Sequence, residues 1–146
     1  MSQIAVVDAS VVLKLFFKDE DYTKQATALI DDYFLHNKIV LICPVLLVYE
    51  AVNALVVATR KKRIPLNDVY EQLHKLLSLE IGARDVEPQA ILELCLKYSI
   101  AAYDAAYLAL AESLDCDLWT GDRAFYNAVK DESPRVKWIG SYTPIS

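Results

Sequence analysis

The sequence predicts an α/β fold, a three-layer α/β/α sandwich built around a parallel sheet. Short apolar runs rich in β-branched residues alternate along the chain with longer helical stretches. Parallel strands need crossover connections, which are usually helical, and strands buried on both faces are apolar almost throughout. The chain has 146 residues and contains neither a Pro/Gly/Ser-rich linker nor an internal repeat. We therefore expect one domain, residues 1–146.

The amino-terminal half predicts two strands and three helices. The β-branched run that begins at Ile39 is typical of a buried strand, and Pro44 suits the first turn of the helix that follows it. The expected elements are a strand over Ile4–Val7, helices over Ser10–Phe17 and Tyr22–Leu35, a strand over Ile39–Ile42 and a helix over Val45–Thr59.

The carboxy-terminal half continues the alternation of strands and helices. The expected elements are a helix over Asn67–Leu77, a weak strand over Leu79–Ile81, helices over Pro88–Lys97 and Ala101–Leu114, a strand over Leu118–Thr120, a helix after Gly121 and a strand over Val136–Ile139. Every strand is therefore separated from the next by at least one helix, as a parallel sheet requires.

The segment from Ile39 to Ala58 allows a second interpretation, a membrane span. It is 20 residues long, is interrupted only by Pro44, Glu50 and Asn53, and is followed by four basic residues. However, an ionised carboxylate near the bilayer centre costs about 2.5–3.5 kcal/mol on insertion scales. A strand, a proline and a helix avoid this cost, so we expect no contact with a membrane.

The composition excludes several classes of function. The three glycines are isolated, so the chain has neither a Gly-rich dinucleotide motif nor a P-loop. With 20 acidic and 15 basic residues the net charge is −5, which argues against binding of nucleic acid through an overall positive charge. The three cysteines lack C-x-x-C spacing and fit a reducing compartment, and the first residues lack the apolar core of a secretory signal. We expect a cytoplasmic protein.

Four acidic residues lie in apolar surroundings. Asp8 and Asp122 follow predicted strands, and the carboxyl ends of parallel strands are where open α/β sheets bind ligands. Glu50 and Asp104 lie in predicted helices that are apolar nearly all round. A buried carboxylate needs a partner, so these four residues are the candidate functional residues.

Each of the four acids also has a purely structural explanation. Asp8 and Asp122 are placed to cap the helices that follow them, and Asp104 lies in a first helical turn, where the helix dipole favours an acid. Glu50 is a candidate for one half of a buried ion pair. Four separate explanations are less economical than one shared cause, so we favour a common site.

A common site of four carboxylates needs a bound cation or raised pKa values, because the ionised groups repel one another. Ligation by oxygen alone, with neither His nor Cys nearby in the sequence, favours Mg²⁺, with Mn²⁺ as a substitute, over zinc or copper. Carboxylates that hold Mg²⁺ commonly do so together with a phosphate of the substrate. The substrate expected from this chemistry is a phosphodiester or a phosphate ester.

Four short motifs carry these acids. They are Val6-Val7-Asp8-Ala9-Ser10-Val11-Val12-Leu13-Lys14, Pro44 followed by Glu50-Ala51-Val52-Asn53-Ala54-Leu55, Tyr103-Asp104-Ala105-Ala106-Tyr107-Leu108-Ala109, and Leu118-Trp119-Thr120-Gly121-Asp122-Arg123-Ala124-Phe125. In this order, over nearly the whole chain, they resemble the PIN-domain ribonucleases, and in particular the VapC-type toxins of prokaryotic toxin–antitoxin pairs.

This resemblance implies a fold and a set of roles. It implies a parallel sheet of order 3-2-1-4-5, and a catalytic, metal-binding site formed by the four acids. The supporting polar residues that it implies are Ser10, Thr120 and Asn53. The implied reaction is Mg²⁺-dependent hydrolysis of phosphodiester bonds in single-stranded RNA, leaving 5′-phosphate and 3′-hydroxyl ends. Asp104 and Asp122 are our candidates for the group that orients or deprotonates the attacking water.

Basic residues near these motifs are candidate RNA contacts. They are Lys14, Arg60, Lys61, Lys62, Arg63 and Arg123. Arg60 to Arg63 lie at the end of a predicted helix. The stronger interpretation of these four side chains is that they are solvated and that their charge interacts favourably with the helix dipole. Tyr103 and Tyr107 are interpreted as core or dimer contacts rather than as stacking platforms.

The expected partners follow from the resemblance and from the apolar excess of the chain. We expect a homodimer, and an antitoxin that inserts an arginine among the four acids, because a guanidinium matches carboxylates bidentately. Two alternatives stay open, a PIN-like module that binds RNA or protein without cleavage and an RNA-processing nuclease outside a toxin system. A phosphatase with Asp8 as nucleophile is disfavoured, because its second acid would stand where Ser10 stands.

Overall fold

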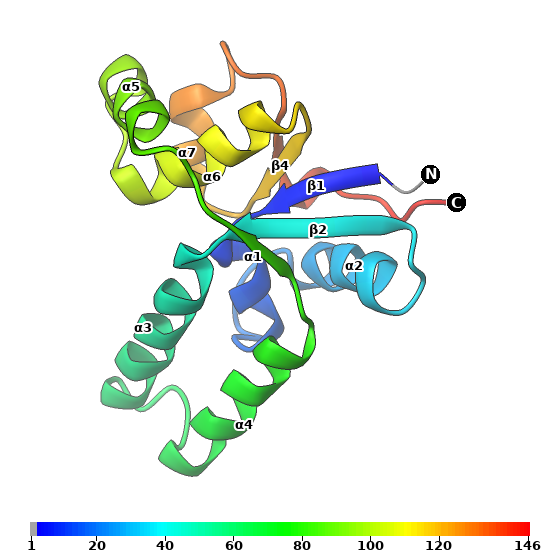
Figure 1. The fold of residues 1–146 in the computed structure, drawn as a ribbon. Coiled ribbons are helices and arrows are strands. Elements are labelled where there is room, and N and C mark those ends of the chain that lie inside the picture. The colour runs from blue at the N-terminus through cyan, green and yellow to red at the C-terminus, as the bar shows by residue number, and fades with distance from the viewer. Residues whose placement is uncertain (1–2) are drawn as a thin grey trace.

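A parallel sheet of five strands forms the centre of the fold. The computed structural model describes residues 3–146, and its strand order is β3-β2-β1-β4-β5 (Figure 1). The strands are β1 (Gln3–Val7), β2 (Ile39–Pro44), β3 (Gly82–Arg84), β4 (Asp117–Thr120) and β5 (Val136–Trp138). All neighbouring strands run parallel, and β1 pairs with β2 on one side and with β4 on the other. The predicted α/β class and strand order are confirmed.

Helices cover both faces of this sheet. They are α1 (Ala9–Val12), α2 (Thr23–Phe34), α3 (Leu46–Arg60), α4 (Leu66–Ser78), α5 (Pro88–Tyr98), α6 (Ala102–Ser113) and α7 (Arg123–Val129). Figure 1 shows α6 against one face with α5 outside it, and α1 and α2 against the other face. Helices α3 and α4 pack against each other and extend away from the sheet as an arm. These layers are the predicted sandwich.

The core lies on both faces of the sheet, against α6 on one side and against α1 and α2 on the other. Seven consecutive residues of α6, from Ala105 to Ala111, are buried, and the strand residues Val6, Val7 and Leu118 are fully enclosed. A helix that is buried all round needs small apolar side chains so that the sheet and α5 can both approach it. Four alanines among these seven residues meet that need.

Three predicted elements differ from the structure. The helix predicted over Ser10–Phe17 is shorter, because α1 ends at Val12 and a 3₁₀ turn follows over Leu13–Leu15. Pro44 closes β2 instead of opening α3, since a proline at a strand end sacrifices few ladder hydrogen bonds. The strand predicted over Leu79–Ile81 lies at Gly82–Arg84.

The displaced strand β3 has a local cause. Leu79 still belongs to the end of α4, where its N–H donates to the Leu76 carbonyl, and Glu80 follows with a left-handed φ of 52°. A left-handed residue of this kind commonly terminates a helix. The chain therefore becomes extended only after Ile81.

The apolar segment from Ile39 to Ala58 is divided between a strand and a helix in the structure. Ile39–Pro44 forms β2 and Leu46–Arg60 forms α3. Within residues 3–146, the helices are all too short or too polar to cross a bilayer.

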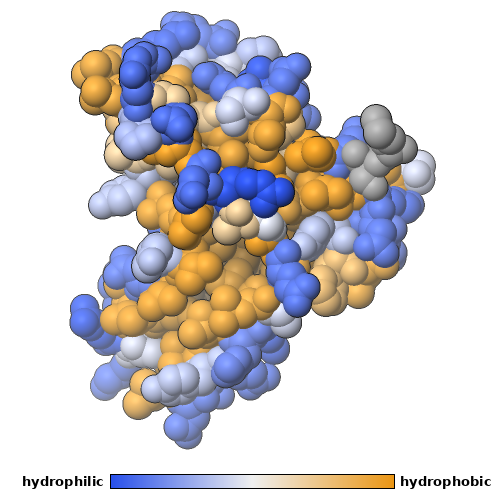
Figure 2. Space-filling model, viewed as in Figure 1, coloured by the Kyte–Doolittle hydropathy of each residue, from blue (hydrophilic) through white to orange (hydrophobic). Residues whose placement is uncertain are grey.

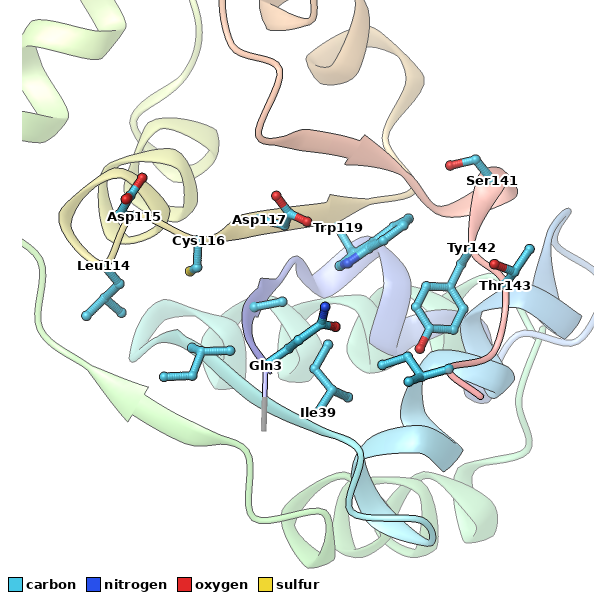
Figure 3. A pocket seen from close by; sticks show the side chains of 13 residues that line it. Gln3, Ile39, Leu114, Asp115, Cys116, Asp117, Trp119, Ser141, Tyr142 and Thr143 are labelled. Carbon is cyan, nitrogen blue, oxygen red and sulfur yellow. The ribbon is translucent and has the colours of Figure 1, made fainter. Parts of the chain in front are cut away.

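A hollow of about 600 Å³ lies at the amino-terminal edge of the sheet. Figure 3 shows Trp119 and Tyr142 close together on one side of it, and Leu114, Asp115 and Cys116 on the other. The rings of Trp119 and Tyr142 meet edge to face, with centroids 4.9 Å apart. None of the predicted catalytic residues lines this hollow.

Candidate active site

Two of the four acids lie at the ends of neighbouring central strands. Asp8 directly follows β1, and Asp122 follows β4 after Gly121. Val7 lies opposite Trp119 in the parallel ladder, and the Asp8 N–H donates to the Trp119 carbonyl at 3.1 Å. Strands β1 and β4 are where the order 3-2-1-4-5 reverses direction, and a ligand crevice opens at such a point.

The other two acids come from helices. Glu50 lies in the second turn of α3 and Asp104 in the first turn of α6. All four acids line one open pocket of about 500 Å³ at the carboxyl edge of the sheet, which we call the acidic pocket. Ser10, Asn53 and Tyr103 also line it. The structure thus brings together four acids that are separated by up to 114 positions in the sequence.

Asp8 is the most buried of the four acids, with 5% of its surface exposed. The Thr120 hydroxyl donates to one carboxylate oxygen at 2.8 Å, and the Ser10 N–H donates to the other at 3.1 Å. Burial is the main cause that raises the pKa of Asp8 to about 7; the charges of Glu50 and Asp104 contribute to the rise, and these two hydrogen bonds act against it. Asp8 therefore titrates near neutral pH while no cation is bound.

Two hydroxyls tie Asp8 to the turn between β4 and α7. The Ser10 hydroxyl accepts the Gly121 N–H at 2.8 Å, and the Thr120 hydroxyl accepts the Asp122 N–H at 3.1 Å. Because Thr120 also donates to Asp8, a single side chain fixes the relative positions of Asp8 and Asp122. Thr120 is fully buried, although it does not line the acidic pocket itself.

Glu50 has a partner that the sequence interpretation missed. The Tyr107 hydroxyl donates to Glu50 Oε1 at 2.6 Å, although only 1% of Tyr107 is exposed. Burial raises the pKa of Glu50, and the hydrogen bond from Tyr107 acts against that rise. Tyr107 lies three positions after Asp104 on α6 and so shares its face of the helix. That spacing was the available signal for a polar role, whereas the apolar surroundings of Tyr107 indicated a core residue.

Asp104 and Asp122 both line the acidic pocket and interact through their charges. Burial raises the pKa of Asp104 to about 6, and the charges of Asp122 and Glu50 contribute to the rise. Asp122 accepts the Phe125 N–H at 3.1 Å as the N-cap of α7. The structure therefore bears out the capping explanation for Asp122, and likewise for Asp8 at the start of α1. Capping and a common site coexist, because a cap uses only part of a carboxylate.

The ion-pair explanation for Glu50 is wrong for the described part of the chain. The six ion pairs within residues 3–146 contain none of the four acids. Four carboxylates thus share a pocket without a basic partner, and the pKa values of three of them are raised. This is the electrostatic state that a divalent cation relieves.

The donor chemistry fits a hard divalent cation such as Mg²⁺. Only carboxylate, hydroxyl and amide oxygens are available from the polar groups that line the pocket, apart from the Asn53 amide nitrogen. However, among the residues from 3 to 146, no three His, Cys, Asp or Glu side chains are gathered closely enough to chelate an ion together. One or two carboxylates with water and a substrate phosphate is the usual mode for Mg²⁺. The pocket suits that mode rather than a closed cage.

The predicted RNA contacts lie outside the acidic pocket. Lys14 is only 6% exposed and pairs with Glu20 at 3.4 Å, and Arg63 pairs with Asp19 at 3.0 Å. Arg60 ends α3, about 15 Å along the helix from Glu50 at 1.5 Å per residue. Lys61 and Lys62 follow Arg60 at that distant end.

Arg123 is the predicted contact nearest to the acids in the chain. It follows Asp122 directly, and its guanidinium carbon lies 3.8 Å from the ring centroid of Trp138. None of the six basic residues lines the acidic pocket. The sequence gives no sign of a role for Trp138, because an aromatic residue in a short terminal strand has no distinguishing pattern.

Comparison with known proteins agrees with this geometry. The crystal structure of PAE2754 from Pyrobaculum aerophilum is 25% identical to this chain, with 95% of this chain and 92% of that chain covered and a TM-score of 0.69. A toxin–antitoxin complex from Klebsiella pneumoniae contains a chain that is 20% identical, with coverages of 97% and 99% and a TM-score of 0.59, which shows a shared fold. No curated protein matches the sequence. The sequence pattern of the PIN domain, a nuclease superfamily, matches residues 5–131, and the chain therefore belongs to the PIN domain family.

Proposed function

We propose that the protein is a Mg²⁺-dependent ribonuclease that hydrolyses phosphodiester bonds of single-stranded RNA. The observation that carries this proposal is the acidic pocket, in which Asp8, Glu50, Asp104 and Asp122 converge from four different elements without a basic partner within residues 3–146. Membership of a nuclease superfamily supports it independently.

The chain's own residues have distinct tasks in this proposal. Asp8 and Glu50 are held by Thr120 and Tyr107, so both are positioned to serve as metal ligands. When bound, Mg²⁺ or Mn²⁺ would stabilise the negative charge on phosphate oxygens and lower the pKa of a water molecule. Asp104 and Asp122 are our candidates for orienting that water and accepting its proton, because both line the pocket and neither is held by a side-chain hydroxyl as Asp8 and Glu50 are.

We further propose that the protein is the toxin of a type II toxin–antitoxin pair. The structural neighbour from Klebsiella pneumoniae, a toxin–antitoxin complex, supports this assignment. An acidic pocket without a cation is a suitable site for an arginine from an antitoxin, because the guanidinium fork matches carboxylates bidentately. Inhibition would then be competition for the positions of the metal and the phosphate.

An apolar face of the arm supports the proposed homodimer. Figure 2 shows apolar side chains gathered over α3 and α4. Val52 and Val56 of α3 and Leu66 and Tyr70 of α4 line a groove there, and all four are exposed. Exposed apolar patches of this kind mark sites of protein contact. A second copy of this chain or an antitoxin helix would cover the groove.

The test is cleavage of a labelled single-stranded RNA by the purified protein. We expect cleavage with Mg²⁺ or Mn²⁺, none with EDTA, and products with 5′-phosphate and 3′-hydroxyl ends. Asp8→Asn should abolish cleavage, whereas Asp131→Asn, which alters an exposed acid that does not line the pocket, should leave it intact. Equal cleavage in EDTA would contradict the metal requirement. Binding of RNA without cleavage under every metal condition would favour the non-enzymatic alternative.

A further inference from the structure

A second pocket lies beside the acidic pocket and shares one turn of the chain with it. It has a volume of about 440 Å³. Asp122 lines the acidic pocket, and its neighbours Gly121 and Arg123 line the second one. A nucleic acid strand whose phosphate lies at Asp122 would therefore have an adjacent nucleotide within reach of the second pocket. We call this the Trp138 pocket.

An arginine and two aromatic rings form one wall of the Trp138 pocket. The Arg123 guanidinium lies over the Trp138 ring at 3.8 Å, and the Tyr22 ring meets that indole edge on, with centroids 5.4 Å apart and planes at 82°. Arg123 is exposed, so the outer face of its planar guanidinium is free to stack. Planar guanidinium and aromatic groups are the surfaces on which unpaired bases stack.

Gly140 allows this wall to form. A Cβ at Gly140 would lie 2.5 Å from Trp138 Nε1 and 2.8 Å from Tyr22 Cε1, closer than real atoms approach. The missing side chain is thus what lets Tyr22 and Trp138 pack together. Trp138 lines the pocket, and its indole N–H lies beside Gly140, so the N–H is sensitive to a change in the packing of this wall.

The charges in the Trp138 pocket suit a base better than a phosphate. Lys14 pairs with Glu20 and Arg63 pairs with Asp19, so most of the charge around the pocket is already neutralised. This leaves Arg123 and Asp21, which take part in none of the ion pairs among the described residues. A phosphate would be attracted by the first and repelled by the second. A neutral base can stack on the guanidinium and donate N–H groups to the carboxylate.

We propose that the Trp138 pocket binds one nucleobase of the single-stranded RNA, next to the phosphodiester bond that is cut. The base stacks on the outer face of the Arg123 guanidinium, whose inner face lies over the Trp138 ring, and Asp21 accepts hydrogen bonds from its Watson–Crick edge. Guanine is the preferred base, because its N1–H and N2–H groups are adjacent donors that a carboxylate accepts together. This inference rests on the proposed ribonuclease function and adds a determinant of sequence preference to it.

The two indole N–H signals give a direct readout that does not depend on activity. The chain has two tryptophans, so a ¹⁵N–¹H correlation spectrum contains two such signals, and Trp119→Phe assigns them. The probes are GMP, AMP, CMP, UMP and ribose 5-phosphate, titrated in EDTA so that no metal contributes. We expect a saturable shift of the Trp138 signal, strongest with GMP and weakest with UMP. Ribose 5-phosphate should leave it unmoved, and the Trp119 signal serves as the internal control.

Three variants separate stacking from charge. Arg123→Ala should weaken GMP binding roughly 10-fold, as the loss of a stacking partner does. Arg123→Lys should bind almost as weakly, because it keeps the charge and loses the plane. Asp21→Asn should reduce the preference for GMP over UMP. Lys130→Ala, which removes a cation from the same helix region near Tyr126, is the matched control and should bind as the parent does.

The outcomes distinguish this inference from the proposed function. If ribose 5-phosphate shifts the Trp138 signal as strongly as GMP, or if Arg123→Lys binds like the parent, the pocket is an anion site and the inference is wrong. If RNA is cleaved but no nucleotide shifts the signal, the inference fails while the ribonuclease assignment stands. If GMP binds as expected but RNA is never cleaved, the ribonuclease assignment fails and the base pocket remains.

Discussion

Asp8→Asn should stabilise the metal-free protein above neutral pH. Burial raises the pKa of Asp8 from 3.8 to about 7. At 1.36 kcal/mol per pKa unit, holding Asp8 ionised in the folded state costs about 4 kcal/mol. Asparagine has nearly the same shape and removes the charge, but its amide fits the Thr120 hydroxyl less well, which offsets about 1–2 kcal/mol. The expected net gain in the free energy of unfolding is therefore about 2–3 kcal/mol.

The pH dependence of this effect has a definite sign. The folded protein keeps the Asp8 proton to higher pH than the unfolded chain does, so the folded state binds more protons between pH 4 and pH 7. The stability of the parent therefore falls as the pH rises through this range. From pH 5 to pH 8, Asp8 alone accounts for a loss of about 2–3 kcal/mol. The raised pKa of Asp104, at about 6, acts in the same direction.

Urea denaturation in EDTA at pH 5 and pH 8 measures this effect. The parent should lose more stability between the two values than the Asp8→Asn variant does, by about 2–3 kcal/mol. The difference between the two slopes is the decisive quantity, because any imperfect fit of the amide cancels from it. For the control variant Asp131→Asn, the change in the free energy of unfolding between pH 5 and pH 8 should equal that of the parent. Equal slopes for the parent and Asp8→Asn would refute the argument that Asp8 is held ionised at a cost.

Four further predictions concern the acids and the partners of the protein. In EDTA, Glu50→Gln should leave the free energy of unfolding unchanged or raise it, because the half-buried carboxylate has no basic partner within residues 3–146; a loss of about 3–5 kcal/mol in urea denaturation would contradict this reasoning. Tyr107→Phe should lower the free energy of unfolding by about 1.5–3 kcal/mol at pH 8, because Glu50 loses its charged hydrogen bond. The same variant should weaken Mn²⁺ binding in calorimetry. In the Glu50→Gln background, the loss of unfolding free energy should be smaller. Sedimentation should detect a dimer, and an antitoxin should lose potency when the arginines of its tail are replaced; a monomer at every concentration, or undiminished potency, would contradict these expectations.

The sequence was sufficient for the part of the site that depends on the sheet alone. Asp8 and Asp122 follow strands, and parallel strands end at the same edge, so their proximity requires only that β1 and β4 be neighbours. The prediction that β1 and β4 are neighbours rests on the resemblance to the PIN-domain family, because hydrophobic periodicity carries no information about strand order. The positions of Glu50 and Asp104 depend on how α3 and α6 pack, which the hydrophobic pattern does not specify for helices that are apolar nearly all round.

Local interactions account for the features that the sequence did not reveal. The Tyr107 hydroxyl lies in a run of apolar residues, and nothing in that run indicates that the helix points it at Glu50. Strand β3 was displaced because Glu80 adopts a left-handed conformation that an ordinary residue rarely takes. Trp138 acquires significance only from Arg123 and Tyr22, which lie far from it in the sequence.

The double use of Asp8 and Asp122 explains how the fold tolerates its acidic pocket. Both residues cap helices through one carboxylate oxygen, Asp8 toward the Ser10 N–H and Asp122 toward the Phe125 N–H. The other oxygen of Asp8 is held by Thr120, whereas the other oxygen of Asp122 has no hydrogen-bond partner within residues 3–146. Each carboxylate oxygen has two lone pairs, so a cation can bind without breaking either cap. The caps therefore fix the directions of the acids before any ligand arrives, and Asp122 has the freer oxygen for the incoming ion or guanidinium.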